Sequence, residues 1–433
     1  MNWYLPIACA AIAVQLLVVY LAVNNHHYVS KRLTARNRFC YRPRTALIVP
    51  CKGIDARFRS NIRSFFEQDY ENHHLLFVVE DQSDPAYQEL AGLKSELAGR
   101  SRALDIQVLV AGLSQSSSQK IHNLLYALDR VPADSEVLAF ADSDICVHRD
   151  WLRHLVRPLY VSKRGATTGY RWFIPTTNNP ATLALSAINA AVSQFLGSSL
   201  FNLAWGGSMA IRTEDFRRLR IGEIWSQTLS DDLSLSRAVK RAGLKITFVP
   251  ECLVASFESS TWRRLYEFGR RQLLITRVYA PGAWWLGFFG SLGSVAGLWG
   301  GLAAALCAGV FHAEHVVLYA AVPVLFFWGQ ITRAVLRQLA VTKTLSEHLP
   351  QLLPAMAADV FGCWLWSLVL FVLMLSSSVG RTIRWRGIRY QLVGPSQIRI
   401  LDARRTTNGD EKGDILLIRP RPVALSEKQI GEK

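Results

Sequence analysis

Residues 45–81 read TALIVPCKGIDARFRSNIRSFFEQDYENHHLLFVVED, and this stretch indicates the class of fold. Two short apolar runs, Thr45–Val49 and Leu75–Val79, predict strands. The basic and aromatic segment Arg57–Gln68 between them predicts a helix. The order strand, helix, strand is typical of an α/β domain.

The same order recurs farther along the chain. Ile106–Val110 and Val137–Phe140 predict two more strands, and Lys120–Leu128 between them predicts a helix. We therefore expect a mostly parallel sheet, with ligand chemistry at the carboxyl ends of its strands.

Acidic residues follow two of the predicted strands. Leu75–Val79 runs into Glu80 and Asp81, and Val137–Phe140 runs into Asp142-Ser143-Asp144 after one alanine. Two carboxylates one residue apart can supply oxygen ligands to a hard divalent cation, which in turn can hold a diphosphate. A D-x-D triplet also occurs in solvated turns, so its place after an apolar strand carries the prediction. Neither a Walker A motif nor G-x-G-x-x-G follows a strand, so any phosphate binding must use metal and basic side chains.

A further acidic pair begins a predicted helix. Ser230 is a suitable N-cap, which places Asp231 and Asp232 in the first turn. Acids are common in the first turn of a helix, and this explains one of the two. A carboxylate at the start of a helix beside a ligand site could equally serve as a general base. The pair Gly206-Gly207 would let the backbone approach a ligand closely, or would form a simple turn.

The composition predicts that part of the chain lies in a membrane. Of 433 residues, 50% are hydrophobic and only 19% are charged, with a formal net charge of +16. Tyr4–Val23 carries no charge and is long enough to cross a hydrocarbon core of ~30 Å. Basic residues follow it from Lys31 onward, which predicts an outer N-terminus and a cytoplasmic domain after the anchor. A cleaved signal peptide would need a basic region ahead of the apolar run, and none is present.

Three more apolar stretches follow: Ala283–Phe311, Val316–Ile331 and Leu352–Leu375. If the last one spans once, the basic segment that starts at Arg381 lies outside, against the charge rule. Either one stretch is interfacial or this segment is an exception. Leu183–Ala204 is apolar but interrupted by polar residues, which suits an interfacial helix that guides a lipid or a helix packed on the sheet.

Several blocks of the sequence, in order and over nearly the whole chain, resemble the ceramide glucosyltransferases and their bacterial relatives. The blocks are Val49-Pro50-Cys51-Lys52-Gly53-Ile54-Asp55, Asn61, Phe65-Phe66-Glu67-Gln68-Asp69-Tyr70, Asp81, Asp84-Pro85-Ala86, Lys120-Ile121-His122-Asn123-Leu124, Asp142-Ser143, Asp231-Asp232 and Thr382-Ile383-Arg384-Trp385-Arg386-Gly387-Ile388-Arg389-Tyr390.

The resemblance implies a membrane-bound, inverting hexosyltransferase of glycolipid biosynthesis. It implies an A-type nucleotide-sugar glycosyltransferase fold, a UDP-sugar donor such as UDP-glucose, Mg²⁺ or Mn²⁺, and a lipid hydroxyl acceptor such as the sphingolipid precursor ceramide. Carried over, Asp232 corresponds to the catalytic base, with Asp231 as a supporting residue. Gly207, from the glycine pair described above, is also expected to support the site. Asp142 and Asp144 correspond to the metal site. The residues implied to bind the nucleotide sugar are Lys52, Asp81, Lys120, Asp142 and Arg271.

One family motif departs from its pattern. The motif (Q/R)-x-x-R-W falls at Arg271–Ile275, where Leu274-Ile275 replaces the Arg-Trp pair. Arg270, Arg271 or Arg277 would then have to supply the positive charge near the diphosphate.

We therefore expect four parts: an anchor (1–30), a cytoplasmic glycosyltransferase domain (31–280), a transmembrane helical region (281–380) and a basic tail (381–433). The expected location is multi-pass in a membrane, most simply a bacterial inner membrane. A processive polysaccharide synthase and a non-catalytic nucleotide-binding membrane protein are the alternatives. Nucleic-acid binding is not expected, because the basic clusters adjoin apolar segments.

Overall fold

The computed structural model describes residues 4–35, 40–198, 201–313 and 316–403. Its centre is a seven-stranded sheet. The strands are β1 (Thr45–Pro50), β2 (His73–Val79), β3 (Asp105–Val110), β4 (Val137–Ala141), β5 (Arg164–Pro175), β6 (Ser208–Arg212) and β7 (Lys245–Glu258).

The sheet has the order β3-β2-β1-β4-β6-β5-β7, and β6 alone runs antiparallel to its neighbours. The expected mostly parallel α/β sheet is therefore confirmed. The four strands predicted from sequence are present, and each observed strand extends its predicted run by one or two residues. Because β1, β2 and β4 run the same way, the predicted acidic strand ends share one edge of the sheet.

Alternate residues of β1 face two separate hydrophobic cores. Leu47 and Val49 contact the helices of one face, which are α2 (Phe58–Phe66), α3 (Pro85–Leu97) and α5 (Trp151–Val156). Ala46 and Ile48 contact those of the other face, which are α4 (Gln119–Leu128), α7 (Thr213–Arg218), α8 (Ile221–Trp225) and α9 (Asp231–Arg241). Short 3₁₀ turns occupy Ala98–Arg100, Arg157–Tyr160 and Ser346–His348.

Within the described residues, four helical segments are long and apolar enough to cross a membrane: Tyr4–Thr34, Pro281–Val310, Val316–Thr344 and Ser346–Ser378. They contain α1 (Tyr4–Thr34), α11 (Pro281–Val295), a π-helical turn (Ala296–Gly300), α12 (Gly301–Val310), α13 (Val316–Thr344) and α14 (Leu349–Ser378). The expected combination of an α/β domain with long apolar helices is thus confirmed.

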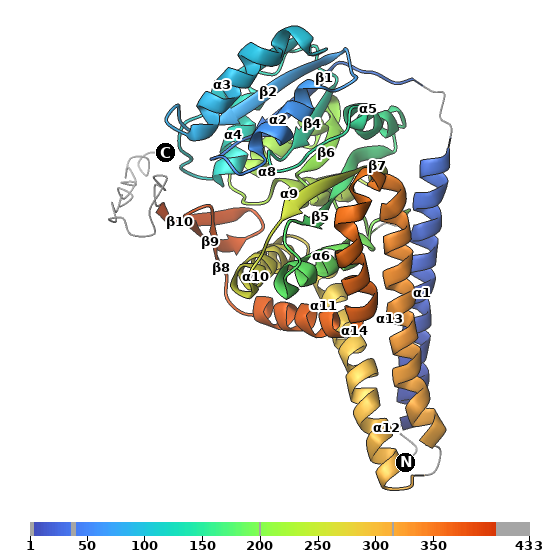
Figure 1. Cartoon of the computed structure of the whole chain (residues 1–433). Helices are drawn as coiled ribbons and strands as arrows, with labels where there is room; N and C mark the ends of the chain where they lie inside the picture. Colours follow the sequence, from blue (N-terminus) through green and yellow to red (C-terminus); the bar gives the residue numbers. More distant parts are fainter. Residues whose placement is uncertain (1–3, 36–39, 199–200, 314–315, 404–433) are drawn as a thin grey trace, which may run out of the picture.

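These helices do not all run the same way. α1 and α12 both pack against α13, and the three extend together away from the sheet (Figure 1). α14 bends, and its C-terminal part passes beneath the sheet domain toward β8 (Figure 1). It packs on α6 (Pro180–Ser193) and α10 (Trp262–Tyr279) as well as on α11 and α13.

The segment 183–204 is only partly helical. α6 ends at Ser193, most of its side chains are buried, and it packs on β5 and α14. Ser186 Oγ donates to the carbonyl of Phe173 on β5 at 2.8 Å. Of the two interpretations of this segment, the structure supports the helix packed on the sheet.

The segment after α14 forms a small antiparallel sheet where a basic tail is expected. Its strands are β8 (Thr382–Trp385), β9 (Ile388–Gly394) and β10 (Gln397–Ala403), in the order β10-β9-β8. Arg386 and Gly387 both have positive φ, at 45° and 82°, as a tight two-residue hairpin requires. The rest of the expected tail, 404–433, lies outside the described residues.

The small sheet packs on α10 at the two positions where the Arg-Trp pair of the motif is replaced. Leu274 of α10 is fully buried, and with Ile275 it belongs to a core shared with Ile383 and Tyr390 of the small sheet. Apolar side chains at 274 and 275 therefore attach the C-terminal sheet to α10.

Candidate active site

A single cavity of about 2210 Å³ connects the carboxyl edge of the large sheet with the apolar helices. Near the sheet it is lined by residues that follow β1 and β4 and by the start of α9. It continues between α6, α10, α11 and α14 and then along α1 and α13.

Lys120 lies between two of the predicted acids. Its Nζ is 2.8 Å from Asp142 Oδ1 and 3.0 Å from Asp231 Oδ2. Ser118 positions the lysine, because it caps α4 by accepting from Ile121 N–H and donates to the Leu229 carbonyl at 3.1 Å. The structure thus brings together residues 120, 142 and 231, which are far apart in sequence.

This charge cluster shifts the pKa values of its members. Burial would lower the pKa of Lys120, but Asp142, Asp231 and Asp232 outweigh burial and raise it. Burial would raise the pKa of Asp142, but Lys120 holds it below its ordinary value. For Asp231 burial prevails over Lys120, and with the charges of Asp232 and Asp142 it raises the pKa to about 6.

Asp232 is held at the start of α9 by three donors. Oδ1 accepts from Ser230 Oγ at 2.6 Å and from Leu233 N–H at 2.7 Å. Oδ2 accepts from Gly206 N–H at 3.0 Å. A carboxylate oxygen can accept two hydrogen bonds, so Oδ2 can accept one more from a ligand in the cavity.

Both glycines of the pair 206–207 are constrained. A Cβ at Gly206 would lie 2.8 Å from Lys120 Nζ and closer still to Asp231. A Cβ at Gly207 would collide with the ring of Trp205, and the Gly207 carbonyl accepts from Asp142 N–H at 3.4 Å. Gly206 lines the cavity, whereas Gly207 supports the strand end from behind.

Asp144 fits the side of the site that would hold a metal. Its Oδ1 is buried without a hydrogen-bond partner, and its Oδ2 is 3.9 Å from Arg171. Burial, followed by the charge of Asp142, raises the pKa of Asp144. A nearby cation would therefore stabilise the ionised form of this carboxyl. Among the described residues, no three His, Cys, Asp or Glu side chains gather as metal ligands. A hard cation commonly uses one or two carboxylates and takes its other ligands from substrate phosphates, so Asp142 and Asp144 fit that arrangement.

Three arginines converge on the same part of the cavity: Arg171 of β5, Arg271 of α10 and Arg386 of the β8–β9 hairpin. Burial, and then the charges of Arg171 and Arg386, lower the pKa of Arg271 to about 10. Arg386 donates to the Lys52 carbonyl, which brings the C-terminal hairpin to the end of β1. Like charges held this close together indicate a site for an anion.

Not every predicted residue lies in the cavity. Arg270 donates to the carbonyls of Ser376 and Val379, and Arg277 donates to that of Gly380. These hydrogen bonds hold the C-terminal end of α14 in place. Of Arg270, Arg271 and Arg277, only Arg271 lines the cavity. Lys52 lines it and pairs with Glu80 at 2.7 Å.

Asp81 is exposed beyond β2 and accepts from Ser83 N–H at 2.8 Å, outside the cavity lining. Its role at the nucleotide stays a prediction.

Sequence reasoning missed Arg171, Arg386 and Glu258 as site residues, although all three line the cavity. Arg171 begins the otherwise apolar run RWFIP, and a charged residue in such a run could have indicated a functional site. Glu258, at the end of β7, gives no such local signal. Its pKa is raised by burial and by Asp144.

The sequence profile of glycosyl transferase family 21 matches residues 6–397. Solved structures with similarity include a mannosyltransferase from Pyrobaculum calidifontis in complex with GDP-Man and Mn²⁺. It has 16% identity, covering 86% of this chain and 97% of that one, with a TM-score of 0.44. Glucosyl-3-phosphoglycerate synthase from Mycobacterium tuberculosis, in complex with Mn²⁺ and UDP-Glc, has 14% identity, covering 54% and 77%, with a TM-score of 0.33.

Proposed function

The chain belongs to glycosyl transferase family 21, and from that premise we propose that it transfers a hexose, glucose by preference, from a UDP-sugar to the hydroxyl of a membrane lipid such as ceramide. The product would be a β-glycoside. One observation carries the proposal: carboxylates suited to a base and a metal share a cavity with three arginines, and the same cavity continues between apolar helices.

The acceptor hydroxyl would be activated by Asp232. Asp232 Oδ2 retains one acceptor position toward the cavity, and Ser230, Leu233 and Gly206 fix its orientation. As the acceptor oxygen attacks the anomeric carbon, its proton passes to Asp232 and the bond from that carbon to the diphosphate oxygen breaks. A single in-line displacement inverts an α-linked donor. Asp231 supports this step by pairing with Lys120.

The leaving diphosphate would be stabilised by cations from several elements. Arg171, Arg271 and Arg386 face the region of Asp142 and Asp144, and Lys120 lies beside Asp142. A divalent metal held by Asp142 and Asp144 would supply Lewis-acid stabilisation of the same oxygens. Lys52, at the end of β1, is placed to contact the nucleotide.

The arrangement also suggests where the protein works. We propose that the four apolar segments hold it in a membrane, most simply a bacterial inner membrane, with the domain 31–280 on the cytoplasmic side, where UDP-sugars are made. The basic residues after α1 support this orientation.

The proposal is tested with membranes that contain the protein. Radiolabelled UDP-glucose, UDP-galactose and N-acetylated UDP-sugars are each incubated with ceramide, diacylglycerol, a sterol-like and a hopanoid acceptor, and the lipid products are resolved. We expect label in a lipid product, with UDP-glucose the best donor. Label that enters only a polymer, or no label with any donor, contradicts the proposal.

The metal is tested in the same assay. Excess EDTA should abolish transfer, and Mg²⁺ or Mn²⁺ should restore it. Asp142→Ala should be more damaging than Asp144→Ala, because Asp142 also anchors Lys120. Full activity in excess chelator excludes a metal at this site.

A further inference from the structure

We propose that the half of the cavity remote from Asp232 is a groove, open sideways to the bilayer between α1 and α11–α12, that holds the hydrocarbon of the acceptor lipid. Its assignment to the acceptor rests on the proposed function. The cavity volume of about 2210 Å³ is more than twice the upper end of the ~300–1,000 Å³ of ordinary ligand pockets, so a nucleotide sugar would leave much of it empty.

One face of α13 forms the floor of the groove. Val322, Phe326, Gln330, Arg333 and Arg337 all line the cavity, and they recur every three or four residues, as one side of a helix does. The face is apolar at its far end and becomes polar and then cationic toward the sheet domain. Val322 and Phe326 are each only 4% exposed, so an amphiphile would place its chains against the exposed apolar walls beside them and its head toward Arg333.

The walls are α1 on one side and α11 with α12 on the other. Val14, Leu17 and Leu21 of α1 line the cavity yet are 58%, 56% and 40% exposed. On the opposite wall a Cβ added at Gly290, Gly293 or Gly300 would meet no atom within 4 Å. Small residues in a membrane segment allow close helix contact, and Gly297 and Gly301 do so against Phe326 and Pro323. The other three face open space instead.

Polar groups along the floor lack partners. Gln330 is only 3% exposed, and neither its amide nitrogen nor its amide oxygen has a hydrogen-bond partner. Arg333 Nε is likewise buried and unpartnered, whereas the neighbouring Arg337 is paired with Asp359. Unpaired polar groups within an apolar segment are costly and therefore indicate a ligand that satisfies them. Hydroxyl or carbonyl oxygens of a lipid head would do so.

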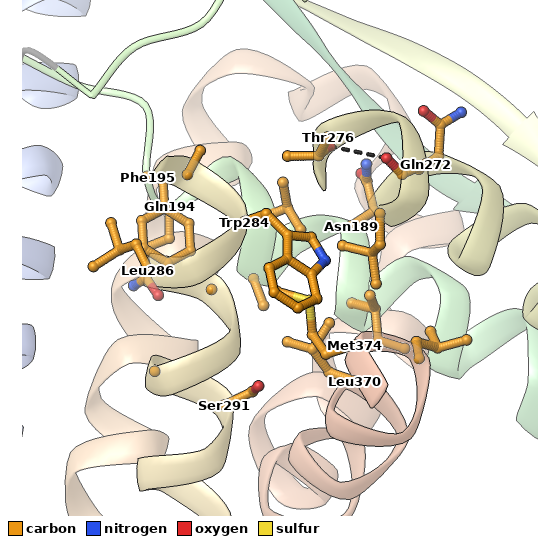
Figure 2. A pocket seen from close by; sticks show the side chains of 18 of the residues that line it. Asn189, Gln194, Phe195, Gln272, Thr276, Trp284, Leu286, Ser291, Leu370 and Met374 are labelled. Carbon is orange, nitrogen blue, oxygen red and sulfur yellow. Dashed lines mark hydrogen bonds between the residues drawn. The ribbon is translucent and has the colours of Figure 1, made fainter. Parts of the chain in front are cut away.

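The groove is continuous with the proposed catalytic acids, because the same cavity extends to them through a chamber beside α11 and α14. Figure 2 shows this chamber lined by Trp284 and Ser291 of α11, Leu370 and Met374 of α14, and Asn189 of α6, with Gln272 and Thr276 of α10 at its upper side. Asn189 Nδ2 is 3.3 Å from the hydroxyl of Tyr170, which also lines the cavity. A lipid in the groove thus has a path for its hydroxyl toward Asp232.

Leucine substitutions that fill the groove test the proposal. Gly293→Leu and Gly290→Leu place a side chain in open space on a helix, where leucine is a better helix former than glycine. Gly309→Leu on α12 is the matched control, because a Cβ there also meets no atom but Gly309 does not line the cavity. Three quantities are measured for each variant: lipid retained per purified protein, labelled lipid product formed in membranes from UDP-[¹⁴C]glucose, and UDP-glucose affinity.

We expect Gly293→Leu to lose the retained lipid and at least tenfold of the lipid product, with UDP-glucose affinity unchanged. Gly309→Leu should match the wild type in all three. Wild-type lipid retention and transfer in both Gly290→Leu and Gly293→Leu would overturn the groove. A wild type that retains lipid in this pattern but neither binds UDP-glucose nor forms product would instead count against the proposed function.

Discussion

Lys120 links the two acids that flank the proposed point of sugar transfer. Its contacts with Asp142 and Asp231 connect the end of β4 to the start of α9. Removing either acid takes away one of the two ion pairs of a buried lysine, which is costly. The neighbouring Asp232 is less buried and is held by neutral donors, which leaves it available to a ligand.

Asparagine at positions 231 and 232 separates the two roles. Asp232→Asn keeps the shape but cannot take a proton, so kcat should fall ~10²- to 10⁴-fold, with UDP-sugar affinity nearly unchanged. Asp231→Asn should be milder. Steady-state kinetics and equilibrium binding of UDP-glucose check both variants. If the larger loss of kcat belongs to Asp231→Asn, Asp231 is the base.

The pKa of Asp231 predicts an acid limb in the pH profile. Since burial raises this pKa to about 6, the carboxyl is neutral below that pH and ionised above it. Protonation breaks its ion pair with Lys120, so kcat/KM should fall as pH decreases through about 6. In Asp231→Asn the limb should disappear or move to lower pH. An unchanged limb in that variant assigns it to another group.

At the residue scale, the four acids of the charge cluster and three of the cations (Lys52, Lys120 and Arg271) were predictable, whereas Arg171, Arg386 and Glu258 were not. Asp142, Asp144, Asp231 and Asp232 stand next to strand ends or helix starts, which periodicity reveals. Arg171 and Arg386 join them through the pairing of β5 with β7 and through the β8–β9 hairpin. A charge in an apolar run marks Arg171 in the sequence, but no local pattern encodes which residues either arginine meets.

At the scale of elements, the C-terminal sheet forms part of the site. Ile383 and Tyr390 pack against Leu274 and Tyr279 of α10, and Tyr279 accepts from Leu229 N–H at 2.9 Å, just before the α9 cap. The sheet thereby supports α9 and carries Arg386 to the end of β1. The basic composition of 381–403 suggested a tail, because an isolated three-stranded sheet needs an apolar partner that the local sequence does not show.

Arg386 tests this contribution. Arg386→Gln should weaken UDP-sugar binding and lower kcat, because it removes one of the three arginines proposed to face the diphosphate. Removing a hydrogen bond to a charged group typically costs ~1.5–3 kcal/mol, or roughly 10- to 150-fold in kcat/KM. Arg389→Gln is the matched control, since Arg389 is exposed on the same hairpin and does not line the cavity. If Arg386→Gln and Arg389→Gln have equal kinetics, Arg386 does not contribute to the site.

At the scale of the whole molecule, the bend of α14 suggests an answer to the conflict between the apolar stretches and the basic C-terminal segment. Arg386 donates to the Lys52 carbonyl, so the small sheet and the large sheet must lie on one side of the membrane. We infer that α1, α11–α12 and α13 cross and that α14 stays at the interface (Figure 1). Sequence hydropathy identified α14 as apolar but does not encode its bend.

Single cysteines test this topology in a variant without the exposed Cys9, Cys40 and Cys307. Gln88→Cys on α3 and Ser396→Cys before β10 should both resist a membrane-impermeant thiol reagent in intact cells. His312→Cys, between α12 and α13, should react. Labelling of Ser396→Cys alone would show that α14 crosses the membrane, and labelling of Gln88→Cys would reverse the orientation.

The anomeric configuration of the product tests the central claim most directly. The claim is a single displacement at the sugar of a UDP-sugar by a lipid hydroxyl, with Asp232 as the base. The glycolipid made by the wild-type protein from α-linked UDP-glucose is purified, and its anomeric proton is assigned by NMR. We predict a β-glycoside, which Asp232→Asn forms far more slowly. An α-glycoside would contradict the account, because retention requires two displacements or a different geometry at the site.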